Sequence, residues 1–267
     1  MSRLWVFLVV TLAASPALAA ATPWQELAPG VRARLISGDT ISGGKALAGL
    51  ELDMPETTKT YWRLPGETGI PTEIDFSAST GMSGATIAWP FPQIDRSQGY
   101  LDFVYYGQLV LPFELSVDEA GAVLNASVTL GVCDEVCVPV MASFSLPLGA
   151  SPDAGQSIRI QQALAATPIE WDRASVPFAG VEANPSGTGL LLSYPHPDID
   201  PVQIIAETGA NGQIFGAPQK SPESAIVEIP LLGGADGQAL AGQSVQLTFM
   251  TAAGPYSVTR SILPATN

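Results

Sequence analysis

The stretch NASVTLGVCDEVCVPVMASFSL, residues 125–146, contains two β-rich runs joined by a short acidic segment. Both runs are rich in Val, Leu and Ser with few charges, and the three residues DEV between them fit a hairpin loop. The two cysteines of the chain, Cys133 and Cys137, stand at the two ends of this loop. The stretch therefore predicts an antiparallel hairpin in which the two thiols face each other.

The predicted hairpin brings the two cysteines within bonding range. Facing positions in an antiparallel pair have Cα atoms about 4.5–5.5 Å apart, which lies within the range that a disulfide requires. Pro139 has no backbone N–H, so the second strand is expected at a sheet edge or at a local irregularity. A disulfide between Cys133 and Cys137 should therefore form readily and be accessible to another protein.

The rest of the chain has the same character. Runs such as KALAGLELDM, QLVLPFELSV, SAIVEIPLL and SVQLTFMT alternate with Gly, Pro, Asn and Asp, and no long stretch follows a helical period. With 46% hydrophobic residues, the chain can bury substantial cores. The pattern predicts an all-β fold built of β-sandwiches.

A change of pattern suggests two domains. The piece LGASPDAGQSIRIQQALAATPIEW interrupts the strands with a polar, Gly- and Pro-containing stretch and one candidate short helix. Because domain boundaries fall in such segments, we place a first β-sandwich at residues 22–149 and a linker at 150–165. A second, smaller β-sandwich-like domain would then cover residues 166–267.

The N-terminus has the pattern of a secretory signal peptide. Arg3 precedes an apolar run over residues 4–14, and the small-residue triplet ALA ends at Ala19. We therefore expect residues 1–21 to be removed and the mature chain to be exported, with the Ala-rich signal suggesting a bacterial periplasm. No later segment approaches the roughly 20 apolar residues of a transmembrane helix, so no membrane span is expected in the mature chain.

The charge of the chain excludes one class of partner. The formal net charge of −14 makes nucleic acid an improbable ligand, since binding to phosphates requires basic surfaces. The acidity can serve solubility or attract a basic partner.

A disulfide in so small a ring can be a structural staple or a redox pair. Closing a ring of about five residues stabilises a protein by roughly 2 kcal/mol, against roughly 3 for a loop of 15 residues. The gain is smaller still where a hairpin already holds the two ends together. The spacing alone leaves both functions open for Cys133 and Cys137.

The loop charges favour a carrier over an aggressive nucleophile. Asp134 and Glu135 lie beside the thiols, and negative neighbours raise a thiol pKa and so lower the thiolate fraction. We expect the disulfide to be opened by the low-pKa thiolate of a dedicated partner, through a mixed disulfide. The side of Val138 and Pro139 looks more open, which favours Cys137 as the sulfur attacked.

Several ordered segments carry a family resemblance. GVCDEVCVP, KTYWRLPGETGIPTEIDF, IAWPFPQI and GQLVLPFEL together resemble the N-terminal periplasmic domain of the thiol:disulfide interchange protein DsbD, especially its ScsB-like branch, over about residues 45–150. The resemblance implies an immunoglobulin-like domain whose redox pair, here Cys133 and Cys137, receives electrons from a membrane-embedded thiol reductase. The resemblance also implies that this pair passes the electrons on to periplasmic thioredoxin-like oxidoreductases.

The chain also departs from that family. Full-length members carry a transmembrane domain and a terminal thioredoxin-like domain, whereas this sequence contains neither and has no Cys-x-x-Cys. We therefore expect the reductant to come from a separate protein. In DsbD the cysteines are further apart and an aromatic cap loop shields them. Tyr100 and Phe103 lie in about the right place for that cap, although aromatic residues before a strand are often core residues.

A second aromatic cluster precedes the hairpin in sequence. Tyr61, Trp62 and Arg63 are followed by a loop rich in Gly and Pro. The cluster can form a binding surface beside the hairpin, and together with Asp134 and Glu135 it completes the set of partner-contact candidates. Alternatively, Trp62 anchors the core and Arg63 extends along it with its charged head in water.

Other chemistries find little support. His196 is the single histidine and no Gly-x-Ser-x-Gly motif surrounds any serine, which disfavours a serine hydrolase. Two thiolates without a nearby histidine are a poor zinc site, so neither metal nor cofactor is expected. Two hypotheses follow: a periplasmic thiol-disulfide exchange protein using Cys133 and Cys137, or a non-catalytic β-sandwich binding or assembly module with an inert hairpin disulfide.

Overall fold

The structure is a computed structural model. It describes residues 20–38, 40–149, 153–193, 196–209, 213–220, 225–233 and 237–265. Residues 1–19 of the predicted signal peptide and residues 150–152 of the predicted linker lie outside the described residues.

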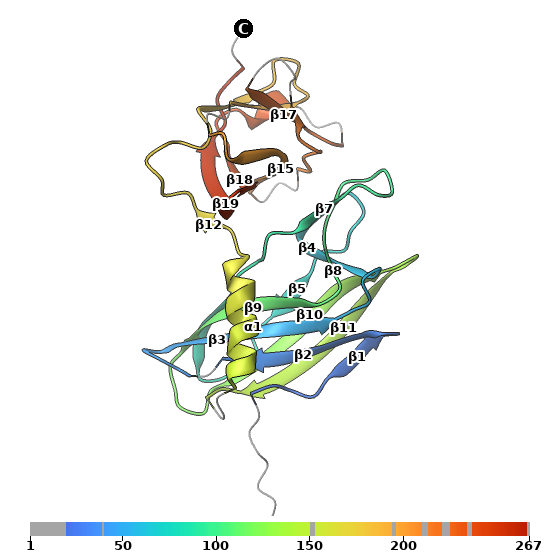
Figure 1. The fold of residues 1–267 in the computed structure, drawn as a ribbon, viewed down its shortest axis with the longest axis vertical. Helices are drawn as coiled ribbons and strands as arrows, with labels where there is room; N and C mark the ends of the chain where they lie inside the picture. The colour runs from blue at the N-terminus through green and yellow to red at the C-terminus, as the bar shows by residue number, and fades with distance from the viewer. Residues whose placement is uncertain are drawn as a thin grey trace, which may run out of the picture.

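Strands and tight turns make up most of the described chain, so the prediction of an all-β fold is confirmed (Figure 1). The first part contains β1 (Gln25–Ala28), β2 (Val31–Ser37), β3 (Lys45–Asp53), β4 (Lys59–Gly66), β5 (Glu73–Asp75), β6 (Met82–Ile87), β7 (Gln93–Asp95), β8 (Asp102–Tyr106), β9 (Leu109–Val117), β10 (Val123–Cys133) and β11 (Cys137–Pro147). The second part contains α1 (Ala154–Ala165), β12 (Ile169–Glu170), β13 (Gly180–Ala183), β14 (Gly189–Ser193), β15 (Ile199–Thr208), β16 (Gln219–Lys220), β17 (Ile226–Pro230), the 3-10 helix η1 (Gly237–Leu240), β18 (Ser244–Thr251) and β19 (Gly254–Ser261).

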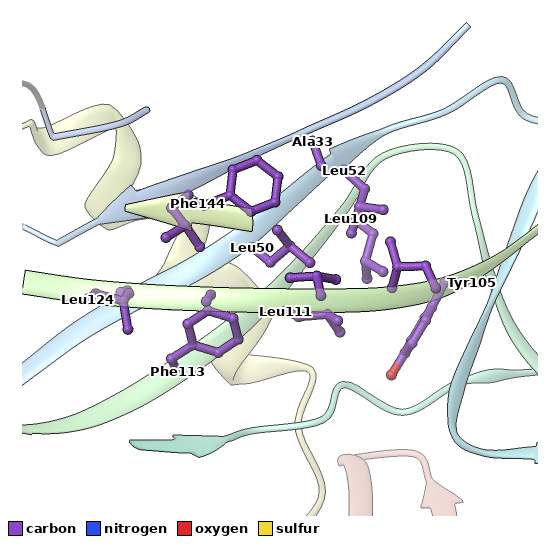
Figure 2. Close-up of a cluster of buried hydrophobic side chains, with 14 of the residues drawn as sticks. Ala33, Leu50, Leu52, Tyr105, Leu109, Leu111, Phe113, Leu124 and Phe144 are labelled. Atoms are coloured by element: carbon purple, nitrogen blue, oxygen red, sulfur yellow. The ribbon is translucent and has the colours of Figure 1, made fainter. Parts of the chain in front are cut away.

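Strands β1 to β11 form two sheets that we call the first sandwich. One sheet has the order β1-β2-β3-β9-β6, and the other has the order β11-β10-β4-β8-β7, with β5 also paired to β10. Alternate residues of β9, among them Leu109, Leu111 and Phe113, point into the core between the sheets, as the two-residue period of a strand requires. Figure 2 shows these side chains packed with Leu50 and Phe144 from other strands.

The predicted hairpin is present as β10 and β11. Their antiparallel register runs without a shift from Val123 opposite Pro147 to Cys133 opposite Cys137, and three residues form the loop. Strand β11 lies at the edge of its sheet, and Pro139 stands opposite Gly131 on it. The edge position expected from Pro139 is therefore found.

Strands β12 to β19 form a second sandwich. Its sheets have the orders β12-β19-β18-β15 and β13-β14-β17-β16, and a separate hydrophobic core lies between them. The helix α1 connects the two sandwiches and lies along the outside of the first (Figure 1). Asp153 caps this helix by accepting hydrogen bonds from the backbone N–H groups of Gly155 and Gln156, and Ile160 is one of the helix residues that are buried.

The helix content bears on the membrane question. Across the described ranges, we find no helical segment with the length and apolar character required to cross a lipid bilayer.

The core of the first sandwich predicts a clear stability effect. Phe113 is fully buried and its ring lies 4.9 Å from that of Phe76. Phe113→Ala should lower the free energy of unfolding by about 3–5 kcal/mol, because the substitution removes buried apolar area and leaves a cavity. Met141→Ala is the matched control, since the exposed Met141 should contribute less than about 0.5 kcal/mol. Urea unfolding measures both, and equal losses would contradict the assigned core.

Candidate functional site

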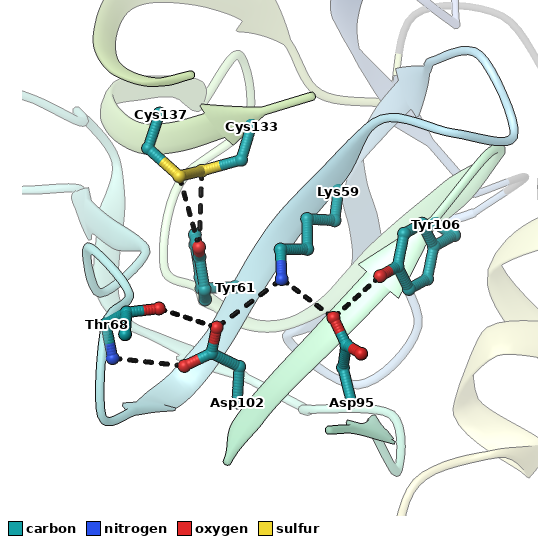
Figure 3. Close-up of a disulfide and its surroundings, with 8 residues drawn as sticks. All are labelled: Lys59, Tyr61, Thr68, Asp95, Asp102, Tyr106, Cys133 and Cys137. Carbon is teal, nitrogen blue, oxygen red and sulfur yellow. Dashed lines mark hydrogen bonds and ion pairs between the residues drawn. A yellow bond between two sulfur atoms is a disulfide. The ribbon is translucent and has the colours of Figure 1, made fainter. Parts of the chain in front are cut away.

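The two cysteines form a disulfide at the end of the β10–β11 hairpin. The Cα atoms of Cys133 and Cys137 are 4.0 Å apart, as expected for facing residues in an antiparallel pair. Their environments differ: Cys133 is 1% exposed, whereas Cys137 is exposed. The disulfide thus joins a buried cysteine to an exposed one, and both sulfurs lie next to Tyr61 (Figure 3).

A tyrosine hydroxyl lies directly beneath the disulfide. Tyr61 comes from β4, which pairs with β10 where Lys59 stands opposite Cys133. The Oη atom of Tyr61 is 3.2 Å from Cys133 Sγ and 3.4 Å from Cys137 Sγ. Because disulfide sulfurs carry no hydrogen, the phenol is the donor in both contacts.

The environment of Tyr61 keeps its proton in place. The side chain is 0% exposed, and burial raises the pKa of its hydroxyl above the ordinary value, although the positive charge of Lys59 partly opposes this. The phenol therefore remains a neutral hydrogen-bond donor at neutral pH. Such a donor would stabilise a thiolate on Cys133 more strongly than it stabilises the disulfide, because hydrogen bonds to charged acceptors are the stronger ones.

A buried ionic network continues below Tyr61. The Nζ atom of Lys59 lies 2.7 Å from Asp95 Oδ2 and 3.4 Å from Asp102 Oδ2 (Figure 3). Tyr106 donates a hydrogen bond of 2.8 Å to Asp95. Thr68 donates to Asp102 through its backbone N–H at 3.1 Å and its hydroxyl at 2.7 Å. Each carboxylate in the network is therefore hydrogen-bonded as well as ion-paired.

The network shifts the pKa values of its members. Burial alone would raise the pKa of Asp95, but hydrogen bonds from Lys59, Ser97 and Tyr106 outweigh it and hold the pKa below its usual range. Burial alone would lower the pKa of Lys59, but Asp95 raises it above the ordinary value. Burial and the hydrogen bond to Asp95 raise the pKa of Tyr106 to about 12. At neutral pH the lysine and Asp95 are thus both charged.

The cap and loop candidates occupy different environments. Tyr100 is 55% exposed, whereas Phe103 is buried in the core with its ring 6.0 Å from that of Trp62. Phe103 therefore has the position of a core residue, the alternative considered for it. Asp134 and Glu135 are exposed in the hairpin loop next to the disulfide.

Tyr61, Trp62 and Arg63 face three different surroundings. Tyr61 contacts the sulfurs, Trp62 is buried in the core, and the Arg63 guanidinium stacks over the Trp62 ring at 4.2 Å. Arg63 also forms an ion pair with Glu207 of the second sandwich. Of the three, Tyr61 is the residue that belongs to the disulfide site.

Four residues of the ionic network do not stand out in the sequence: Lys59, Asp95, Asp102 and Tyr106. A usable signal exists for Lys59, which stands two residues before Tyr61 and so shares its face of the strand. The same period places Val104 and Tyr106 of β8 on the side of Tyr61 and Cys133, opposite to Phe103. The carboxylates come from separate strands, β7 and β8, and their convergence requires the sheet order.

Several exposed apolar side chains lie near Cys137 along the chain. Val136 in the loop is 72% exposed, and Val138 on β11 is also exposed. Met141, on the same strand as Cys137, is 82% exposed. An apolar surface of this kind beside Cys137 is suited to contact with another protein.

A metal site requires several ligating side chains close together. Within the described residues, no three His, Cys, Asp or Glu side chains are grouped in a way that would hold a metal ion.

Comparisons with known proteins give a family match for part of the chain and a solved structure of similar fold. Residues 32–148 match the family described as "Thiol:disulfide interchange protein DsbD, N-terminal". The chain is similar to the crystal structure of the N-terminal periplasmic domain of ScsB from Proteus mirabilis, with 24% sequence identity and a TM-score of 0.73 over 92% of this chain and 99% of that one. No curated protein matches the chain at a significant level. The structural likeness establishes the fold across both sandwiches.

The ionic network predicts a pH-dependent contribution to stability. Asp95→Asn should lower the free energy of unfolding by about 3 kcal/mol at pH 7, because Lys59 then loses one partner of a buried ion pair. Since the pKa of Asp95 is lowered on folding, its contribution is complete above its unfolded value of about 3.9 and is lost as the pH falls towards the folded value. The difference between the wild type and the variant should therefore shrink at acid pH.

Urea unfolding at pH 7 and at acid pH measures this difference. Asp53→Asn is the control, because the more exposed Arg32–Asp53 pair should contribute less than about 1 kcal/mol. A difference for Asp95→Asn that is the same at both pH values would contradict the assigned charge state.

Proposed function

We propose that this chain, whose residues 32–148 form a DsbD N-terminal domain, is a periplasmic thiol-disulfide exchange protein that uses Cys133 and Cys137. It would accept reducing equivalents from a membrane-embedded thiol reductase and pass them to thioredoxin-like oxidoreductases. The observation that carries the proposal is the asymmetric disulfide, with Cys137 exposed and Cys133 buried against the Tyr61 hydroxyl. The description of the family as thiol:disulfide interchange supports it.

Reduction begins with attack on the exposed sulfur. A thiolate of the donor forms a bond to Cys137 Sγ, and the bond between Cys137 and Cys133 breaks. The electron pair of that bond leaves on Cys133 Sγ as a thiolate. Tyr61, 3.2 Å away, donates its hydrogen bond to this sulfur, so the leaving group is stabilised where negative charge develops.

Three further thiol-disulfide exchanges complete a cycle. The second thiolate of the donor attacks the donor sulfur of the mixed disulfide, which releases the Cys137 thiolate, and water supplies the protons for the dithiol. The donor departs as a disulfide. In delivery, the Cys137 thiolate attacks the disulfide of an oxidised acceptor, and Cys133 then attacks Cys137 Sγ to restore the internal disulfide and release the reduced acceptor.

The surface near Cys137 fits a partner with matching chemistry. Val136 and Val138 supply apolar contact, and Asp134 and Glu135 supply negative charge beside it. A partner whose reactive cysteine is bordered by apolar and basic side chains would complement this surface. These exposed residues are therefore the partner-contact residues in the proposal.

The periplasm is the compartment in which this exchange would operate. The signal-peptide pattern of residues 1–21 supports export, and the matched ScsB structure is described as a periplasmic domain. In this proposal the domain of residues 22–149 carries the exchange chemistry, and the domain of residues 166–267 follows the linker of residues 150–165.

The reduction potential separates this function from an inert disulfide. The purified protein, equilibrated in graded glutathione buffers and analysed by alkylation and mass spectrometry, should give a potential between about −270 and −180 mV, as exchange proteins do. A value below about −300 mV is typical of structural disulfides and would favour a non-catalytic binding module instead.

Single-cysteine variants test which sulfur is attacked. Cys133→Ser keeps the exposed Cys137 and should form a mixed disulfide with glutathione disulfide at least about tenfold faster than Cys137→Ser, whose remaining thiol is buried. Both variants should react at similar rates in denaturant, which serves as the control. Equal rates in the folded proteins would count against attack at Cys137.

A further inference from the structure

Three consecutive residues of β4 connect the disulfide to the second sandwich. Tyr61 holds its hydroxyl against both sulfurs, and Trp62 is buried in the first core. The guanidinium of Arg63 stacks over the Trp62 ring and pairs with the carboxylate of Glu207, which lies on β15 of the second sandwich. Tyr61, the hydrogen-bond donor of the site, is therefore only two residues along the chain from Arg63, which forms an ion pair with the second sandwich.

The pairing of strand β4 within its own sheet is irregular. Its register with β8 runs from Lys59 to Tyr61, breaks, and resumes at Gly66. On its other side β10 pairs with it where Cys133 stands opposite Lys59. The stretch just after Tyr61 therefore lacks a continuous ladder. Side-chain contacts help to position it: those of Trp62 and Arg63, and a hydrogen bond of 2.6 Å from the Thr72 hydroxyl to the Tyr61 carbonyl.

The second sandwich is fixed against the first at the same place. Ile205 of β15 is buried in the core of the first sandwich, whereas its neighbours Ile204 and Ala206 belong to the core of the second. Glu207 is the next residue along the same strand. The backbone N–H of Phe91 also donates to the carbonyl of Ala166 at 2.9 Å, close to the end of α1. Glu207 thus projects from a strand that both cores hold.

Glu207 is half-buried, and its carboxylate pairs with Arg63. One of its oxygens, Oε2, accepts from Arg63, and the other, Oε1, is buried without a hydrogen-bond partner among the described residues. Because withdrawing part of a carboxylate from water is costly unless a cation compensates it, the ion pair favours a defined position for Arg63.

We propose that Glu207 is a positioning residue for the redox site, acting through Arg63 to hold β4 so that the Tyr61 hydroxyl stays against Cys133. This inference rests on the proposed thiol exchange and assigns the second sandwich a role in it. With the pair broken, Tyr61 loses its close contact, the thiolate that leaves on Cys133 when the disulfide opens loses a hydrogen bond, and the disulfide becomes harder to reduce.

A double-mutant cycle tests the inference in the full mature chain. Glu207→Gln removes the charge at similar volume, and Tyr61→Phe removes the hydroxyl. In glutathione buffers, Glu207→Gln should lower the equilibrium constant for reduction by about tenfold, which equals about 30 mV for a two-electron couple. On the Tyr61→Phe background the same substitution should have no further effect, because the donor is already absent.

Control variants separate positioning from general destabilisation. Glu228→Gln makes the same chemical change in the second sandwich, where Glu228 accepts a hydrogen bond of 2.7 Å from Asn184, and it should leave the potential unchanged. Arg63→Lys keeps the positive charge but removes the planar stacking on Trp62, and it should lower the potential as Glu207→Gln does. It therefore keeps the inference testable if Glu207→Gln does not fold. Thermal unfolding of each variant records stability separately.

The outcomes distinguish this inference from the proposed function. A lowered melting temperature with an unchanged potential would make the ion pair purely structural and overturn the inference. An equal shift with and without the Tyr61 hydroxyl would also overturn it, because the effect would not pass through Tyr61. The proposed function fails on a different result, a wild-type potential below about −300 mV, whereas the inference concerns the differences between variants.

Discussion

Successive side chains of an extended strand point to opposite faces of the sheet, and this constraint on β4 determines where the site lies. Tyr61 points to the sulfurs and Trp62 into the core, so the donor cannot leave the disulfide unless the core residue beside it also moves. The hairpin supplies the reciprocal constraint, because its register places Cys133 opposite Cys137 and next to Lys59. The site is therefore built from two strands that are both fixed by packing.

The buried charges below Tyr61 are organised around a single lysine. Lys59 contacts one oxygen of Asp95 and one of Asp102, and these same oxygens accept from the hydroxyl groups of Tyr106 and Thr68. The other oxygens accept from the backbone N–H groups of Ser97 and Thr68. A buried ion pair often stabilises a fold no better than apolar residues of the same size would, so stability alone does not account for such a group. Here the positive charge lies close to the Tyr61 ring, 5.8 Å from its centroid, and contributes to the electrostatic environment of the donor.

The sequence was most informative where the relevant contacts are local. The hairpin, its three-residue loop and the facing cysteines follow from neighbouring residues, and the structure contains all three. The network around Lys59 depends on the order of β4, β8 and β7, which periodicity does not determine. Local sequence patterns do not predict the ion-pair partner of Arg63 either, since Glu207 lies 144 residues away along the chain. The position of Phe103 in the sequence does not decide between a cap residue and a core residue, because a shift of one residue moves a strand side chain to the other face of the sheet.

The proline on the edge strand has a consequence for association between molecules. In an antiparallel ladder, closely spaced facing Cα atoms mark pairs that exchange no hydrogen bonds, and Cys133 and Cys137 form such a pair at 4.0 Å. Pro139, two residues further along, stands in the same type of pair, so its backbone nitrogen faces the open side of β11. A strand from another molecule would find a donor missing there, next to the exposed sulfur. The edge can remain uncovered for side-chain contacts while resisting the backbone pairing that leads to aggregation.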